Sequence, residues 1–112
     1  MAKVDHPISR YASEAATLLG QLVRKARIER QMSTLNVAER AGISRGLLRR
    51  IEAGDPGCAI GAVFEVAAIV GVRLFDAEHV AISQAIESNR QVLTLLPKSI
   101  RSPRTEEVRD DF

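Results

Sequence analysis

The sequence predicts an all-α domain of five helices with short arms at both ends. Its 112 residues match the size of one domain. Apolar residues recur at three- and four-residue spacing over most of the chain, and glycine or proline separates the periodic segments. Only the segment 72–75 is β-prone, so a short edge strand there is the one departure we expect from an all-helical fold.

The composition is that of an ordinary globular protein, with 46 % hydrophobic and 27 % charged residues. The formal net charge is only +2, so an interaction with nucleic acid must be argued from where the charges lie. Cys58 is the only cysteine, which excludes an internal disulfide and makes the cytoplasm the expected compartment. The apolar runs at 59–64 and 66–72 are too short to span a bilayer, and the first ten residues lack the apolar core of a signal peptide. We therefore expect no interaction with a membrane.

Four parts are expected along the chain: an N-terminal arm over 1–12, a helical domain over 13–75, a C-terminal helix over 76–96 and a flexible tail over 97–112. The arm has no periodicity and contains Pro7. The tail contains Pro103, is basic up to Arg104 and becomes acidic from Glu106. Such a segment is typical of a chain that does not fold alone.

The first helix begins at a cap, Ser9 or Ser13, and continues to Arg30. Its apolar residues share one side, while the basic residues of 24–30 lie mostly on the other. The apolar set is Leu18, Leu19, Leu22, Val23 and Ala26.

Two short helices follow. The first is expected over Thr34–Ala41 and ends at Gly42, where a left-handed cap would fit. The second covers 45–53, and the hydroxyl of Ser44 can cap its first turn.

A fourth helix is expected over Ile60–Val70, where Gly71 stops it before the β-prone segment 72–75. Asp76 can cap a fifth helix that continues to about Leu96 and stops before a proline. One row of this helix has spacings of four, three, four and three residues: Ile82, Ile86, Asn89, Leu93 and Leu96. That spacing indicates a coiled-coil-like seam with one polar member, and it also suits packing within one chain. Both interpretations stay open.

The most informative segment reads MSTLNVAERAGISRGLLRRIEAG, from Met32 to Gly54. Small Ala38 permits a close helix crossing and Gly42 turns the chain, which gives the spacing of a helix-turn-helix. The segment resembles the DNA-binding unit of the Xre family, the lambda-repressor and Cro type, with the run AERAGISR as a specific match. Residues 18–74 resemble the compact helical domain of that family, so a lambda-repressor-like fold is expected.

Charge is concentrated in the same part of the chain. Between Arg24 and Arg50 eight basic residues face two acidic ones, a local charge of +6 in a chain whose total is +2. With Leu48 and Ile51 turned inward, the third helix leaves four residues outward: Arg45, Gly46, Arg49 and Arg50. An arginine fork can donate two hydrogen bonds to guanine in the major groove. A solvated helix face is the alternative.

The resemblance to the Xre family implies a role for each of these positions. Arg45, Gly46, Arg49 and Arg50 match base-contacting positions, although Gly46 has no side chain with which to read a base. Thr34 and Ser44 match positions that touch phosphate, and we add the cations at the same face as phosphate contacts: Arg24 and Arg40.

A structural ion pair is also expected. The family often pairs the acidic residue at the end of the recognition helix, here Glu52, with an arginine of the first helix, here Arg27. A buried pair would fix the two helices together, whereas an exposed pair would contribute little.

Enzymatic and metal-binding interpretations find little support. His6 and His79 have no second ligand at metal-binding spacing, so we expect solvent-exposed side chains and no metal or other cofactor. Cys58 has no histidine at motif spacing, which favours an inert thiol. We therefore expect no enzyme.

One helix-turn-helix covers half a site, so we expect a homodimer on a palindromic operator in double-stranded DNA. Two regions could hold the dimer together, the 72–75 strand and the 77–96 helix. The candidate residues are Val72, Leu74, Ile82, Ile86, Asn89 and Leu93.

Segments outside the helix-turn-helix indicate a smaller group of proteins within the Xre family. The runs EAGDPG, IGAVFEVA and VRLF, with LPK and the ending DDF, resemble HipB-type antitoxins. The resemblance implies that the protein represses its own operon and binds a HipA-like kinase toxin. Phe112 is the only aromatic residue beyond Phe75, which makes it a candidate anchor for this partner, and a solvated tail is the alternative. The alternatives are a stand-alone Xre-type regulator and a helical adaptor that has lost DNA binding.

Overall fold

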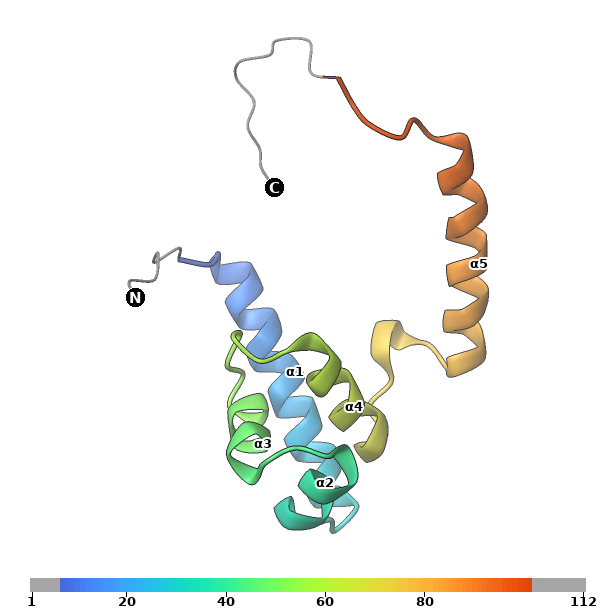
Figure 1. Ribbon diagram of the computed structural model, residues 1–112. Coiled ribbons are helices and arrows are strands. Elements are labelled where there is room, and N and C mark those ends of the chain that lie inside the picture. Colours follow the sequence, from blue (N-terminus) through green and yellow to red (C-terminus); the bar gives the residue numbers. More distant parts are fainter. Residues whose placement is uncertain (1–6, 102–112) are drawn as a thin grey trace. The chain divides into compact units, whose positions relative to one another are not determined.

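The computed structural model describes residues 7–101, and every regular element in this range is a helix (Figure 1). The elements are α1 (Arg10–Glu29), α2 (Thr34–Ala41), α3 (Arg45–Glu52), α4 (Ile60–Val70), the short 3₁₀ helix η1 (Leu74–Asp76) and α5 (His79–Leu95). The prediction of an all-α fold is confirmed. The first six residues of the predicted arm, residues 102–112 of the predicted tail and with them Phe112 lie outside the described residues.

The chain divides into two compact units, the first ending at Asp76 and the second beginning at Ala77. In the first unit α1 to α4 share one small core. Aliphatic side chains alone form it: Val23, Val37, Ala38, Leu48, Ile51, Val66, Ala67 and Val70. Because all four helices contribute to this core, α2 and α3 are held in place by α1 and α4 and not by each other alone.

The helix boundaries follow from local chemistry. The hydroxyls of Ser9, Ser33 and Ser44 each accept a hydrogen bond from a backbone N–H in the first turn of α1, α2 and α3, at 3.1, 3.0 and 3.0 Å. Of the two predicted caps of α1, Ser9 is the one used. Gly42 ends α2 in the left-handed region at φ 71°, and the N–H of Ile43 then donates to the carbonyl of Ala38 at 3.0 Å. A tight turn therefore joins α2 to α3.

Gly20 allows α1 and α3 to approach closely. A Cβ atom at this position would lie 2.5 Å from the carbonyl oxygen of Ile51 and 2.8 Å from that of Glu52. Any side chain would force the two backbones apart, because real Cβ atoms do not approach a carbonyl oxygen this closely. The glycine thus sets how deeply the C-terminal end of α3 sits against α1.

The prediction of a strand at 72–75 is wrong. Val72 is tied to the end of α4, since its N–H donates to the carbonyl of Ala67 at 2.8 Å. The side chains of Val72 and Leu74 pack against the core of the first unit, and Phe75 takes a left-handed conformation at φ 55°. The chain therefore curls into η1, and no extended edge is left to pair with a second copy.

The predicted start of the last helix is also wrong. Asp76 lies in the 3₁₀ turn at φ 52°, where its backbone is not in the extended conformation of an N-cap. Helix α5 begins at His79 after Glu78, without a side-chain capping hydrogen bond, and ends at Leu95. None of its residues is buried, so α5 has no core of its own within the second unit.

In the part of the chain that the structure describes, no helix has both the length and the apolar character needed to cross a membrane.

Candidate nucleic-acid interface

Helix α3 separates its residues cleanly into two faces. Leu48 is fully buried and Ile51 is 3 % exposed. The residues predicted to contact bases, Arg45, Gly46, Arg49 and Arg50, are all exposed. Since Arg45 and Arg49 are one helical turn apart, their guanidinium groups leave the helix on the same side. Helix α3 thus presents a basic face to solvent.

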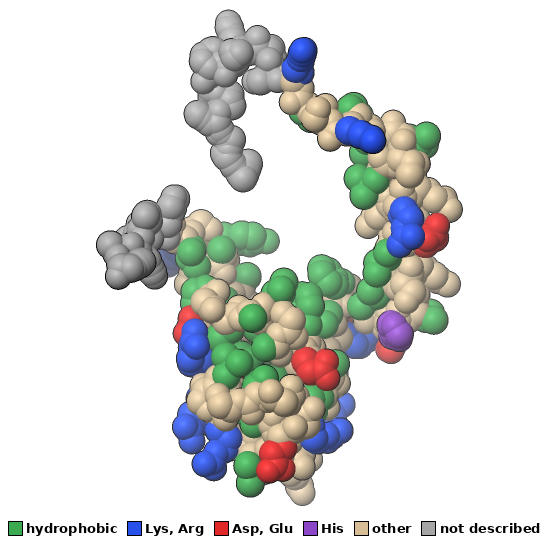
Figure 2. All heavy atoms as spheres, viewed as in Figure 1, with side chains coloured by type: hydrophobic (Ala, Val, Ile, Leu, Met, Phe, Trp, Pro, Cys, Tyr) green, Lys and Arg blue, Asp and Glu red, His purple; other side chains and the backbone are tan. Residues whose placement is uncertain are grey.

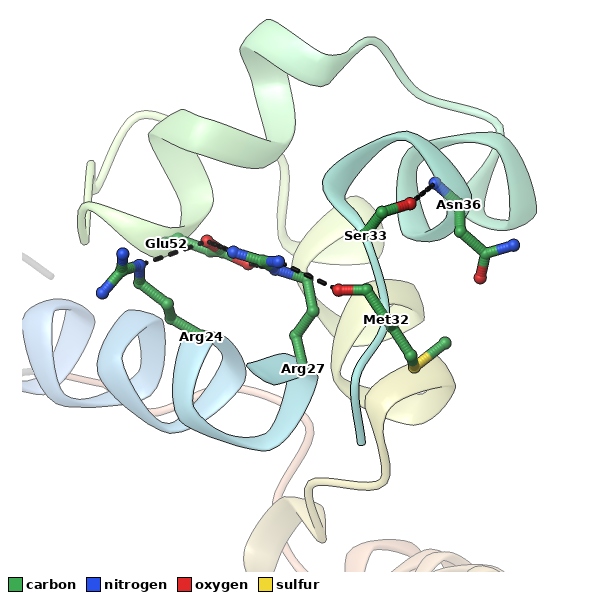
Figure 3. A network of polar contacts seen from close by, with 6 residues as sticks. All are labelled: Arg24, Arg27, Met32, Ser33, Asn36 and Glu52. Atoms are coloured by element: carbon green, nitrogen blue, oxygen red, sulfur yellow. Dashed lines mark hydrogen bonds and ion pairs between the residues drawn. The ribbon is translucent and has the colours of Figure 1, made fainter. Parts of the chain in front are cut away.

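An ion pair fixes α3 against α1. Arg27 donates from Nε to Oε2 of Glu52 at 2.7 Å and from Nη2 to Oε1 at 3.1 Å (Figure 3). Its third nitrogen, Nη1, donates to the backbone carbonyl of Met32 at 3.0 Å, at the loop that leads into α2. The structure therefore places the predicted pair together, and it adds a contact to α2 that the sequence did not indicate.

Both side chains of this pair are nearly removed from solvent. Arg27 is 11 % exposed and Glu52 is 7 % exposed. The hydrogen bonds to Glu52 raise the pKa of Arg27 above its ordinary value, although burial opposes this shift. The guanidinium fork of Arg27 therefore joins α1 to α3 and to the loop that leads into α2.

A shallow hollow opens beside the pair and brings predicted phosphate contacts together. Its lining residues come from α1, α2 and α3 and the residue that follows α3: Arg24, Arg27, Thr34, Arg49, Glu52 and Ala53. Arg24 leans toward the same carboxylate, with Nε 3.9 Å from Oε1 of Glu52. Thr34 is the first residue of α2, so its hydroxyl lies at a helix N-terminus, where anions are favoured.

The remaining predicted phosphate contacts lie outside this hollow. Arg40 is exposed in the last turn of α2. The Oγ of Ser44 accepts from the N–H of Leu47 at 3.0 Å, and this leaves its own hydroxyl proton for a second partner. The structure thus brings Arg24, Thr34 and Arg49 together and places Arg40 and Ser44 apart from them.

Arg50 has a partner that the sequence analysis missed. Its Nε donates to Oδ2 of Asp55 at 2.8 Å, and Oδ1 of Asp55 accepts from the N–H of Gly57 at 2.8 Å. The hydrogen bond from Arg50 is the main reason why the pKa of Asp55 is lowered, and the Gly57 N–H adds to it. The spacing Asp-Pro-Gly after α3 is the signal that could have revealed this turn. Through Asp55, the Arg50 side chain therefore stabilises the turn between α3 and α4.

Three cations on α2 and α3, Arg40, Arg45 and Arg49, form no ion pair within residues 7–101. Among the ion pairs of residues 7–101, Glu52 binds Arg27, Asp55 binds Arg50 and Glu29 binds Lys25. Figure 2 shows Lys and Arg side chains gathered at the lower left of the first unit, over α3. Positive charge without an ion-pair partner in the described residues therefore lies on α2, at Arg40, and on α3, at Arg45 and Arg49.

The histidine and cysteine side chains do not assemble into a site in the described range. His79 is exposed at the start of α5, Cys58 is half-buried before α4, and His6 lies outside the described residues. In residues 7–101 no three His, Cys, Asp or Glu side chains come close enough together to hold a metal ion.

Comparisons of the chain with family models, with curated proteins and with solved structures gave no match.

Proposed function

We propose that this protein is a sequence-specific double-stranded DNA-binding repressor of the Xre type, with α2 and α3 as its helix-turn-helix. One observation carries the proposal. On α3 the guanidinium groups of Arg45 and Arg49 are exposed and without an ion-pair partner in residues 7–101, while Leu48 and Ile51 hold the opposite side of the helix in the core.

Base recognition is assigned to the outward side of α3. A helix of this width fits the major groove, where a guanine offers O6 and N7 to a guanidinium fork. Arg45 and Arg49 would each read one guanine, with a discrimination of about 1–3 kcal/mol per base. Gly46 lies between them in the sequence and has no side chain, and a Cβ there would make an ordinary contact with Oγ of Ser44 at 3.8 Å. The helix backbone can therefore approach the bases closely.

Phosphate contacts would fix the orientation of α3 in the groove. Arg24 and Thr34 line the hollow, whereas Arg40 and Ser44 lie at the two ends of the α2–α3 turn. Contacts of this kind position a protein on the duplex without reading sequence. Because Arg50 is held by Asp55, we assign it a minor part in base recognition.

A homodimer belongs to the proposal, because one recognition helix covers a half-site and two must lie about 34 Å apart to read a palindrome. The narrower prediction of an autoregulatory antitoxin with a HipA-like kinase partner rests on the resemblance of short segments. Its proposed anchor, Phe112, lies outside the described residues. An adaptor without DNA binding is the second candidate, and the unpaired arginines of α3 argue against it.

A salt titration tests the DNA-binding part directly. Fluorescence anisotropy with a mixed-sequence duplex measures the affinity at several potassium chloride concentrations, and the logarithm of the affinity is expected to fall linearly with the logarithm of salt. Replacing one phosphate-contacting cation, Arg40→Gln, should lower this slope by about one. Arg10→Gln is the matched control, since Arg10 is exposed at the start of α1 and bound to Glu14. Equal slopes for the two variants would contradict the assignment of the interface, and no binding at low salt would refute DNA binding.

A further inference from the structure

Helix α5 carries an apolar row that the second unit leaves uncovered. Ile86, Leu93 and Leu96 are each at least half exposed and Ile82 is half-buried. Successive residues turn by about 100°, so these four residues and Asn89 lie along one line of the helix surface. Soluble proteins seldom leave such a row open to water.

The surface of α5 is hollowed along this row. The depression is lined by Ile86, Asn89, Arg90, Leu93, Thr94 and Lys98. Four of these residues stand at positions i, i+3, i+4 and i+7, which is the diamond of side chains that receives a knob from a facing helix in a coiled coil. The hollow therefore coincides with a position at which a side chain of a facing helix can pack.

Asn89 decides which helix fits. It lies at the centre of the row, seven residues from Ile82 and seven from Leu96. An apolar partner would bury its amide without a hydrogen-bonding group, and burying an unpaired amide is unfavourable. A second copy of α5 centred on the same residue supplies the complement, because one amide donates from its nitrogen while the other accepts at its oxygen.

The geometry points to self-association of two chains through α5, in a register that sets Asn89 opposite Asn89 of the second copy. With the two helices parallel, each apolar residue of the row faces its own counterpart in the other chain. The row covers only two heptads, so we expect a dimer of moderate affinity. The role of this dimer rests on the proposed function, because its role is to bring two recognition helices to one operator.

Cysteine crosslinking tests the register without DNA, so its failure is distinct from a failure of the DNA-binding proposal. In the full chain with Cys58→Ser, the variant Asn89→Cys should form a covalent dimer under mild oxidation, because the two Cβ atoms would lie near the 4 Å of a disulfide. Gln91→Cys is the control, since Gln91 is about 200° around the helix from Asn89. No crosslink at residue 89, or an equally fast crosslink at residue 91, would overturn the inference.

Sedimentation equilibrium on the unoxidised full chain provides the second test. Leu93→Asp should raise the dimer dissociation constant at least tenfold, because it places two carboxylates in the seam. Val80→Asp should leave it unchanged. The two residues are equally exposed, at 64 % and 66 %, but Val80 lies away from the row. A wild-type chain that stays monomeric up to millimolar concentration, or a Leu93→Asp variant that dimerises like wild type, would overturn the inference.

Discussion

The substitution Glu52→Gln tests what the ion pair with Arg27 does for the fold. It keeps the shape of the side chain, removes the negative charge and replaces one acceptor oxygen with an NH₂ donor. The two donors of Arg27 now bonded at 2.7 and 3.1 Å would then meet one acceptor and one donor. The guanidinium charge would stay in a position where the side chain is 11 % exposed, without its counter-ion.

The magnitude follows from the burial of the pair. Removing one partner of a buried pair costs about 3–5 kcal/mol, whereas an exposed pair contributes about 1 kcal/mol or less. The exposures of 11 % and 7 % place this pair near the buried limit, and the hollow beside it admits some water. We therefore expect a loss of about 3 kcal/mol. For a domain of this size that corresponds to a fall in Tm of about 12–24 °C.

Thermal unfolding followed by circular dichroism at 222 nm measures this change. The matched control is Glu29→Gln, the same chemical change in a pair of 3.4 Å whose side chains are 70 % and 61 % exposed. That variant should lose less than about 1 kcal/mol. If Glu52→Gln melts within a degree or two of Glu29→Gln, then the pair does not hold α1 and α3 together and the reasoning is wrong.

Three further predictions use the same unfolding and binding assays. Gly20→Ala should destabilise the domain by at least about 2 kcal/mol, because a new Cβ would lie 2.5 Å from the carbonyl oxygen of Ile51. The control Gly46→Ala, on the exposed side of α3, should stabilise the domain by about 0.5–1 kcal/mol. Equal melting temperatures for the two variants would contradict the close approach of α1 and α3. Asp55 has a lowered pKa in the folded state, so its contribution to stability is present above about pH 4 and is lost as pH falls further. The Tm difference between wild type and Asp55→Asn should therefore shrink in acid. A Tm difference that does not depend on pH would count against the hydrogen bond between Arg50 and Asp55. Asp55→Asn should also release Arg50 toward phosphate and steepen the salt slope of DNA binding by about one, and an unchanged slope would show that Arg50 does not reach the duplex.

Much of the fold is predictable from the sequence because local signals define it. Helices α2 and α4 have the predicted bounds, and a serine cap or a terminal glycine marks three of their four ends: Ser33, Gly42 and Gly71. Arg27 and Glu52 come together as the resemblance implied. For the helix ends a short pattern of residue types determines the local conformation, whereas the ion pair joins two helices that are distant in sequence and was implied by the resemblance.

The errors lie where tertiary contacts override local preference. The segment 72–75 has β-prone residues, but the packing of Val72 and Leu74 on the core and the left-handed Phe75 make it a turn. The same turn removes Asp76 from the start of α5. The bond between Arg50 and Asp55 was missed because it depends on how the α3–α4 turn folds back on the helix, which the composition of the helix alone does not reveal.

The measurement that tests the central claim most directly is the sequencing of duplexes that the full chain selects from a random DNA library, with Arg45→Ala and Arg49→Ala selected in parallel. The account predicts an enriched palindromic motif with guanines in both half-sites, spaced by about one helical turn, and each variant should lose preference at one guanine per half-site. The absence of an enriched motif, or the same motif from both variants, would contradict the claim that these two arginines read DNA.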